Sequence, residues 1–239
     1  MNLSIIIPCF NSEKYILKNI EKLKKYIRKK NYKYEIIIID DCSSDKTFKI
    51  LKKFKIKNKN IKIYKNSFNE GKSYSLIRGI KKTKYEKIII IDSDLPYFSK
   101  LNIVIRRLKN YDFVLINRGH KKSKNIGKES SAYQIIRSLI GYIVNLIIRI
   151  SFSIEIKDTQ AGLKGFIKPK NFLKIKFFSK RFFFDLELLL HFVSQKKKVF
   201  SIPVFFKVPT DSSIKIFDLK KNFEVIKELI IICFNKKIR

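Results

Sequence analysis

Short isoleucine runs alternate with lysine-rich segments through the first half of the chain, and this alternation limits the fold more than any other feature. The runs lie at residues 3–8, 34–40, 61–66 and 87–92. The segments between them repeat apolar residues at helical spacing, at 12–30, 43–55 and 71–83. Strands that are apolar on both faces and separated by helices are typical of a parallel sheet covered on both sides. We therefore predict an α/β protein with a Rossmann-like, mostly parallel sheet and helices on both faces.

The second half has a less regular pattern. We predict helices at 100–110, 132–150 and 218–235, strands at 111–117 and 199–208, and a basic loop at 118–131. A length of 239 residues suits one compact domain with a small appendage. We assign 1–210 to a catalytic domain and 211–239 to a C-terminal helix or tail that packs on this domain or on a membrane surface.

Composition favours an anionic partner and a reducing compartment. Lys and Arg number 54 against 20 Asp and Glu, and the net charge of +34 attracts polyanions or anionic lipid. Lys, Ile, Asn and Phe are all abundant, as A+T-rich coding would also produce, so charge alone identifies no partner. The three cysteines form no CxxC pair, which favours a cytosolic chain without disulfides or zinc.

We see no leader, and the apolar part of 132–150 is shorter than the roughly 20 residues of a membrane span.

Acids gather where the predicted strands end. Asp40 and Asp41 end the second strand, Asp92 and Asp94 end the fourth, and open parallel sheets bind ligands at this edge. Carboxylates at i and i+2 can hold Mg²⁺ or Mn²⁺, which would stabilise a departing diphosphate. The alternative is that both acids cap the next helix.

Two further segments also have two interpretations. In "IDDCSSDKT" (39–47) an Asp would contact a ribose or a base edge, or the segment forms only a turn and a helix cap. Lys72 in "NEGKSYSLIRGI" (69–80) would contact phosphate, or it is one more solvated lysine.

In this order, the motifs resemble those of the family 2 glycosyltransferases. They are "SIIIPCFNSEKYI", "YEIIIIDDCSSDKT", "NEGKSYSLIRGI", "IIIIDSDLP", "KDTQAGLKGF" and "FFFDLELL", and the likeness covers about residues 3 to 210. The subgroup they most resemble is the polyprenyl-phosphate (dolichyl-phosphate) glucose and mannose synthases. The resemblance implies a GT-A nucleotide-sugar-binding fold and a metal-dependent, inverting transfer to the phosphate of a polyprenol.

The resemblance also implies roles for individual residues. Pro8, Phe10, Asn11 and Asp41 would line the nucleotide pocket, and Asp92 and Asp94, with Ser93 between them, would hold Mg²⁺ or Mn²⁺ on the diphosphate. Our donor-binding set adds Asp40 and Lys72 from the segments above, and is therefore Pro8, Phe10, Asn11, Asp40, Asp41, Lys72, Asp92 and Ser93. The catalytic set is Asp94, the arginines Arg118 and Arg137 that face the acceptor phosphate, and Asp158 and Gln160 in a loop that closes over the site. Asp185 and Glu187 match an acidic segment further on. The sequence departs from the family pattern at Phe10, Ser12, Pro96 and Gly141.

The function we predict is transfer of a hexose from a UDP-glucose-type or GDP-mannose-type donor to a polyprenyl phosphate. We expect a peripheral enzyme on the cytoplasmic face of an anionic membrane, with a separate membrane-anchoring protein as a further partner and no nucleic acid. One alternative is transfer to a hydroxyl of a cell-surface glycan, which needs a carboxylate base from Asp158, Asp185 or Glu187. A phosphate acceptor is already anionic and needs none. Two others are a basic nucleic-acid-binding protein and an inactive relative.

Overall fold

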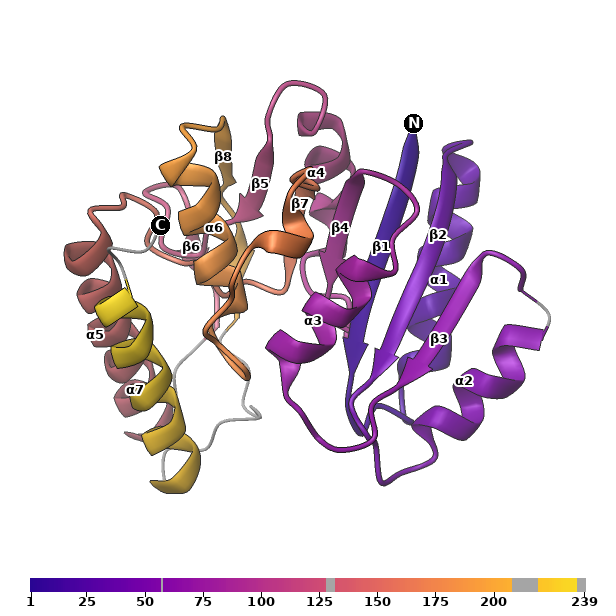
Figure 1. The fold of residues 1–239 in the computed structure, drawn as a ribbon, viewed down its shortest axis with the longest axis horizontal. Coiled ribbons are helices and arrows are strands. Elements are labelled where there is room, and N and C mark those ends of the chain that lie inside the picture. Colours follow the sequence, from indigo (N-terminus) through magenta and orange to yellow (C-terminus); the bar gives the residue numbers. More distant parts are fainter. Residues whose placement is uncertain (57, 128–131, 208–218, 236–239) are drawn as a thin grey trace.

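The computed structural model describes residues 1–56, 58–127, 132–207 and 219–235, and for 132–138 and 219–222 it describes the backbone only. Seven strands form the central sheet, in the order β3-β2-β1-β4-β7-β5-β8 (Figure 1). They are β1 (Asn2–Cys9), β2 (Lys33–Asp40), β3 (Ile61–Lys65), β4 (Lys87–Ile91), β5 (Phe113–Ile116), β7 (Leu163–Ile167) and β8 (Val199–Ile202). Only β7 among these runs antiparallel to its neighbours. The mostly parallel sheet is thus confirmed.

Helices cover both faces of this sheet, as predicted (Figure 1). They are α1 (Ile16–Lys29), α2 (Thr47–Ile56), α3 (Lys72–Lys81), α4 (Leu101–Arg107), α5 (Ala132–Phe152), α6 (Phe184–Ser194) and α7 (Leu219–Phe234), with short 3₁₀ turns at Phe98–Lys100 and Phe172–Lys174. Ile5 and Ile7 pack in one core cluster with α1, α2 and α4, whereas Ile6 packs in the other with α3, α5, α6 and α7. Successive strand residues point to opposite faces, which is why β1, β2 and β4 each contain consecutive isoleucines.

Several boundaries differ from the predicted ones. We did not predict β7, and the late strand divides into β8 and β9 (Phe205–Phe206), which pairs with β6 (Lys124–Asn125) within the basic loop. The helix predicted from residue 12 begins at Ile16, because the Ser12 carbonyl first accepts the Tyr15 amide in a turn. The domain boundary predicted at residue 210 falls outside the described residues.

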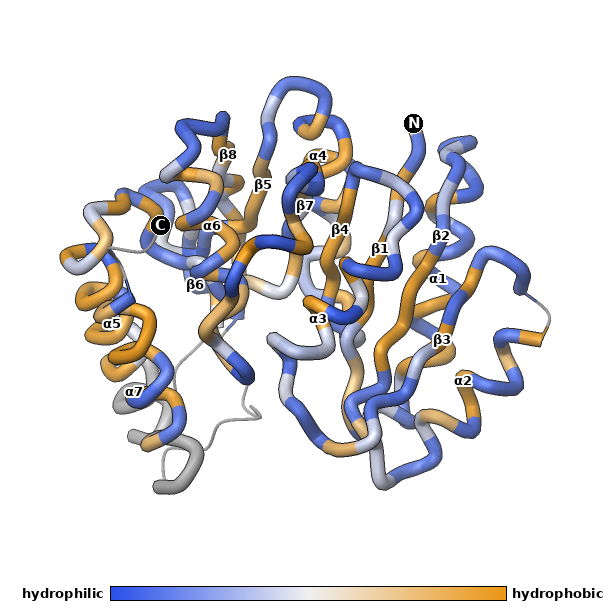
Figure 2. Tube along the Cα trace, viewed as in Figure 1, coloured by the Kyte–Doolittle hydropathy of each residue, from blue (hydrophilic) through white to orange (hydrophobic). Residues whose placement is uncertain are grey.

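α5 and α7 lie at the end of the molecule opposite α2 and are largely apolar (Figure 2). Each packs one side on the core through Ile148, Leu229 and Ile232. Each also exposes large hydrophobic side chains: Leu139, Ile140, Tyr142, Ile143, Ile147 and Ile150 on α5, and Phe223, Ile226, Ile230 and Phe234 on α7. Within the described parts of the chain, no helix combines the length and the apolar character that crossing a bilayer requires.

Candidate active site

The end of β4 and the start of β7 meet at one edge of the sheet. Because β7 is antiparallel, its first residues lie where the parallel strands β1, β2 and β4 end. The amide of Asp92 donates a 2.9 Å hydrogen bond to the carbonyl of Gly162. A Cβ on Gly162 would lie 2.9 Å from Asp92 Cγ and 2.7 Å from Pro96 Cγ, so only glycine lets the two segments approach this closely. The segment that contains Asp158 and Gln160 is thereby brought beside the Asp92–Asp94 turn.

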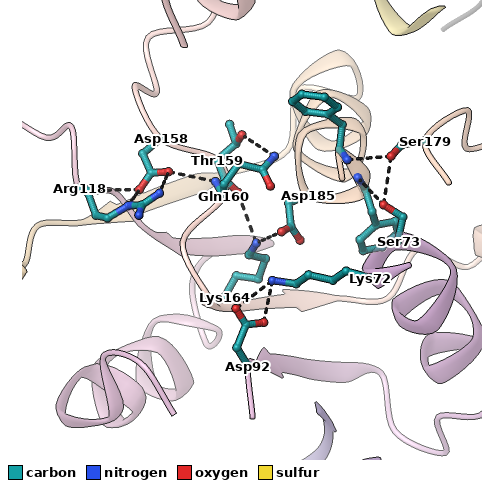
Figure 3. A network of polar contacts seen from close by, with 12 residues as sticks. Lys72, Ser73, Asp92, Arg118, Asp158, Thr159, Gln160, Lys164, Ser179 and Asp185 are labelled. Carbon is teal, nitrogen blue, oxygen red and sulfur yellow. Dashed lines mark hydrogen bonds and ion pairs between the residues drawn. The ribbon is translucent and has the colours of Figure 1, made fainter. Parts of the chain in front are cut away.

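Lys72 holds the first carboxylate of that turn. Its Nζ lies 2.7 Å from Oδ1 and 2.9 Å from Oδ2 of Asp92 (Figure 3). Burial lowers the pKa of Lys72, but the carboxylates of Asp92 and Asp185 outweigh it and leave that pKa above its usual value. Lys72 is therefore a charged component of the site and not a solvated lysine.

Helix α1 and the turn that precedes it fix the middle of the Asp92–Asp94 turn. Ser93 Oγ lies 3.2 Å from Ser12 Oγ and 3.5 Å from the Tyr15 hydroxyl, and Asn19 Nδ2 donates a 2.9 Å hydrogen bond to the Ser93 carbonyl. Ser12, where the sequence departs from the family pattern, thus contacts the metal-candidate turn through its hydroxyl. Ser93 faces the protein, which leaves the carboxylates on either side of it to face a ligand.

Asp94 is the exposed carboxylate of the turn. Partial desolvation and then the negative charge of Asp92 raise the pKa of Asp94 above its usual value. A divalent cation would relieve the repulsion between these two carboxylates, and oxygen ligands of this kind suit Mg²⁺ or Mn²⁺. No group of three or more His, Cys, Asp or Glu side chains that could hold a metal occurs in the described residues. A metal there would have two protein ligands and would take the rest from diphosphate oxygens and water, which is a common arrangement for Mg²⁺. The residues fit such an ion.

Asp41 shapes the loop that leads into α3. Its Oδ1 accepts hydrogen bonds from Asn66 Nδ2 (2.7 Å) and the Glu70 amide (3.0 Å), and its Oδ2 accepts one from the Gly71 amide (2.8 Å). Gly71 has a φ of 91°, a conformation that glycine adopts at little cost. Asp41 therefore positions the backbone immediately before Lys72.

The other residues expected to bind the donor lie around the ends of β1 and β2. Asp40 has an exposed fraction of 0% and accepts hydrogen bonds from the Ser43 hydroxyl and amide, so in this conformation it organises the turn. Asn11 Oδ1 accepts the Ser44 amide at 2.9 Å, which joins the two turns. Phe10 is 47% exposed beside them, whereas Pro8 is buried within β1, beyond the last pair that β1 forms with β4.

Arg118 and Asp158 form a two-point ion pair. Arg118 Nε lies 2.6 Å from Asp158 Oδ2 and Nη2 lies 2.9 Å from Oδ1 (Figure 3). The amides of Arg118 and Gln160 also donate to this carboxylate. Burial raises the pKa of Asp158, but the bonds and charge of Arg118 outweigh it and hold that pKa below its usual range. The side chain of Arg137, the second predicted acceptor arginine, lies outside the described residues, and its role stays a prediction.

Lys164 and Asp185 form a second ion pair, close to Asp92 (Figure 3). Lys164 Nζ is 2.7 Å from Asp185 Oδ2, and both side chains are almost fully buried. Burial lowers the pKa of Lys164 despite the attraction of Asp185. Asp185 Oδ1 is buried without a hydrogen-bond partner among the described residues, and Asp185 also raises the pKa of Lys72. Sequence reasoning missed Lys164, although a lysine inside the apolar run "GLKGF" was a visible signal.

An open α/β sheet with one reversed strand and two carboxylates beyond β4 is the architecture of a GT-A glycosyltransferase, the fold class we predicted. The sequence profile of glycosyl transferase family 2 matches residues 4–178, and the chain belongs to this family and is a glycosyltransferase. Curated relatives include dolichyl-phosphate beta-glucosyltransferases of Trichomonas vaginalis (28% identical; 91% of this chain, 69% of the relative) and human (26%; 87% and 64%). The chain thus spans about two thirds of their length.

Solved structures show the same fold. Glucosyl-3-phosphoglycerate synthase from Mycobacterium tuberculosis, in complex with Mn²⁺, UDP-glucose and phosphoglyceric acid, matches with a TM-score of 0.67 and 15% identity over 97% of this chain and 79% of its own. Residues 1–349 of TarS from S. aureus, in complex with UDP-GlcNAc, match with a TM-score of 0.57 and 19% identity over 97% of this chain and 66% of that one.

Proposed function

We propose that this glycosyltransferase transfers a hexose from a UDP-glucose-type or GDP-mannose-type donor to a polyprenyl phosphate, such as dolichyl phosphate, with inversion and with a divalent cation. The dolichyl-phosphate beta-glucosyltransferases among its relatives support this acceptor. The neighbour that contains Mn²⁺ and UDP-glucose supports the donor and the metal. Asp92 and Asp94 would hold the ion, whose chemistry would be to neutralise the departing diphosphate.

One observation of the site favours a phosphate acceptor over a hydroxyl. The three acids that could serve as the base for a hydroxyl acceptor are all engaged and nearly buried. Asp158 is bound by Arg118, Asp185 is bound by Lys164, and Glu187 accepts the Phe178 amide; their exposed fractions are 4%, 2% and 1%. A phosphate monoester is nucleophilic without such a base, so binding and orientation can supply much of the catalysis.

The protein side chains would divide the work between the two substrates. On the donor side, Asp92 and Asp94 would hold the metal, Lys72 beside them would contact the diphosphate, and Asp41 and Asn11 hold the loops that would surround the nucleotide. On the acceptor side, Arg118 would bind the lipid phosphate through guanidinium N–H groups that do not bond Asp158, such as those of Nη1. Arg137 would act with it.

The lipid acceptor also gives a role to the apolar end of the molecule. The exposed hydrophobic side chains of α5 and α7 would insert into the surface of the cytoplasmic leaflet, and the charge of +34 would attract its anionic lipids. A separate anchoring protein would add to this attachment.

The experiment that tests the function measures transfer of labelled sugar from UDP-glucose and GDP-mannose to dolichyl phosphate, with Mn²⁺ and with chelator. We expect label in the lipid fraction that requires the metal and is lost in Asp94→Asn. Glu86→Gln is the matched control, because it removes an exposed acid just before the other end of β4. Label on a glycan hydroxyl acceptor and none on lipid would contradict the proposal.

A further inference from the structure

The loop of residues 179–182 lies between α7 and α3 and is held by one side chain of α7. The carboxylate of Glu228 accepts four hydrogen bonds from this loop. Its Oε1 accepts the amides of Lys180 (2.9 Å) and Arg181 (2.7 Å), and its Oε2 accepts the Ser179 hydroxyl (2.8 Å) and the Phe182 amide (3.0 Å). Four bonds fill the acceptor capacity of a carboxylate.

The same loop satisfies the start of α3. The first N–H groups of a helix have no partner within the helix and must find one elsewhere. The Ser73 amide donates to the Arg181 carbonyl (3.2 Å), and the Tyr74 amide donates to the Lys180 carbonyl (3.1 Å). A Cβ on Gly71 would lie 2.9 Å from Arg181 Cα, so the two backbones are in contact.

Two consecutive peptide groups therefore connect Glu228 to α3. The group between Lys180 and Arg181 donates its N–H to Glu228 and accepts the Tyr74 amide with its carbonyl. The group between Arg181 and Phe182 does the same with Ser73. Hydrogen bonds in such chains polarise one another, and a negative charge is favourable near a helix N-terminus. The negative charge of Glu228 thus acts on the N-terminus of α3 indirectly, through these two peptide groups.

The first residue of α3 is Lys72, whose ammonium lies on both carboxylate oxygens of Asp92. We infer that Glu228 is a positioning residue of the active site, which fixes the N-terminus of α3 through two peptide groups and so sets Lys72 against Asp92 and the donor diphosphate. The inference rests on the proposed function where it names the diphosphate. It makes α7 part of the donor site although α7 contains none of the residues that would contact the donor.

The test compares Glu228→Gln with Glu224→Gln. The first change replaces one acceptor oxygen with a donor that faces amide N–H groups. The second change neutralises an acid one turn earlier on α7. Glu224 is partly exposed, and its Oε2 forms a longer ion pair with Arg181 Nε, at 3.4 Å. Hydrogen exchange of the 72–76 amides and the Kd for UDP-glucose and GDP-mannose, measured without lipid, are the readouts.

We expect faster exchange at Ser73 and Tyr74 and a donor Kd weakened about tenfold in Glu228→Gln, with exchange in β1, β2 and β4 unchanged and Glu224→Gln like the wild type. The double variant Lys72→Met/Glu228→Gln should bind the donor no more weakly than Lys72→Met alone. Faster exchange confined to α7 and 179–182, or an unchanged Kd despite a loosened α3, would overturn the inference.

A second variant and a second readout test the inference if Glu228→Gln does not fold or if the wild type binds no donor. If Glu228→Gln does not fold, Glu228→Asp keeps the carboxylate but shortens the side chain, and it should shift both readouts in the same direction by less. If the wild type binds neither nucleotide sugar, the proposed function fails, while exchange at Ser73 and Tyr74 still decides whether Glu228 fixes α3.

Discussion

Lys72 lies on Asp92 with its ammonium 2.7 and 2.9 Å from the two carboxylate oxygens, which is where a metal ion would bind. In this conformation the ammonium of Lys72 therefore occupies the position beside Asp92 that a metal ion would take. A metal that binds the Asp92–Asp94 turn would compete with this ammonium for Asp92, and the carboxylate of Asp185 also attracts Lys72.

Replacing Lys72 should consequently have opposite effects on metal and donor. In Lys72→Met we expect Mn²⁺, titrated without donor and followed by electron paramagnetic resonance, to bind about tenfold more tightly, because a like charge is removed. UDP-glucose should bind about tenfold more weakly, because the diphosphate loses a cation. Lys81→Met, at the exposed other end of α3, is the control. Weaker Mn²⁺ binding in Lys72→Met would show that the ammonium does not compete with the metal.

The Arg118–Asp158 pair should make stability depend on pH. The folded pKa of Asp158 lies below its unfolded value of about 3.9, so the stabilisation is present above that value and is lost as pH falls through the folded pKa. We expect Asp158→Asn to lower the free energy of unfolding by about 1–3 kcal/mol at pH 7. Urea titrations from pH 7 to pH 3 should show this difference shrinking below pH ~4. A difference that stays constant with pH would contradict the assignment.

The buried Lys164–Asp185 pair should behave as one unit. Asp185→Asn leaves the Lys164 ammonium without its ion-pair partner in the interior and should cost about 3–5 kcal/mol. Lys164→Met in the same chain removes that charge, so the double variant should be more stable than Asp185→Asn. Denaturant unfolding of the four proteins of this cycle gives the coupling free energy. Additive losses would mean that the two groups do not interact.

The exposed side chains of α5 should govern attachment to membranes. We expect Ile147→Glu/Ile150→Glu to reduce co-sedimentation with vesicles that contain about 30% phosphatidylserine by about fivefold or more, with nucleotide-sugar binding unchanged. Ile56→Glu is the control, since Ile56 is 82% exposed at the end of α2, away from α5 and α7 (Figure 1). Equal losses in both variants would indicate that charge alone, and not this apolar surface, directs binding.

The sequence was sufficient for the parts of the fold in which both faces of a strand are buried. The isoleucine runs of β1, β2 and β4 read as strands because each lies between two helical layers, and the acids that follow them mark the edge of the site. The strand β7 was missed because its sequence "LKGFI" contains a lysine and a glycine and follows Gly162 directly, a pattern that does not indicate a strand. The lysine is tolerated only because Asp185, on a helix far along the chain, pairs with it.

Pairing between distant residues also limited the prediction of the site. Asp92, Asp94 and Arg118 are recognisable in their motifs, yet the bond of Lys72 to Asp92 depends on how α3 is placed. Glu228 lies outside every motif, in a lysine-rich and isoleucine-rich tail whose pattern indicates only a helix. Its role comes from a loop some 46 to 49 residues earlier, a distance that local periodicity cannot span.

The reversed strand determines how the segment between β5 and β7 is connected to the central sheet. β5 and β7 are antiparallel neighbours, so the chain leaves the sheet after Ile116 and returns to it at Leu163 at the same edge. Everything between, α5 included, is topologically one enlarged hairpin connection. Its described residues add no strand to the central sheet, so the strand pairings of that sheet do not include them. Under the proposed function, Arg118 and its partner Asp158 on the acceptor side lie in this connection, whereas the residues expected to bind the donor all precede it.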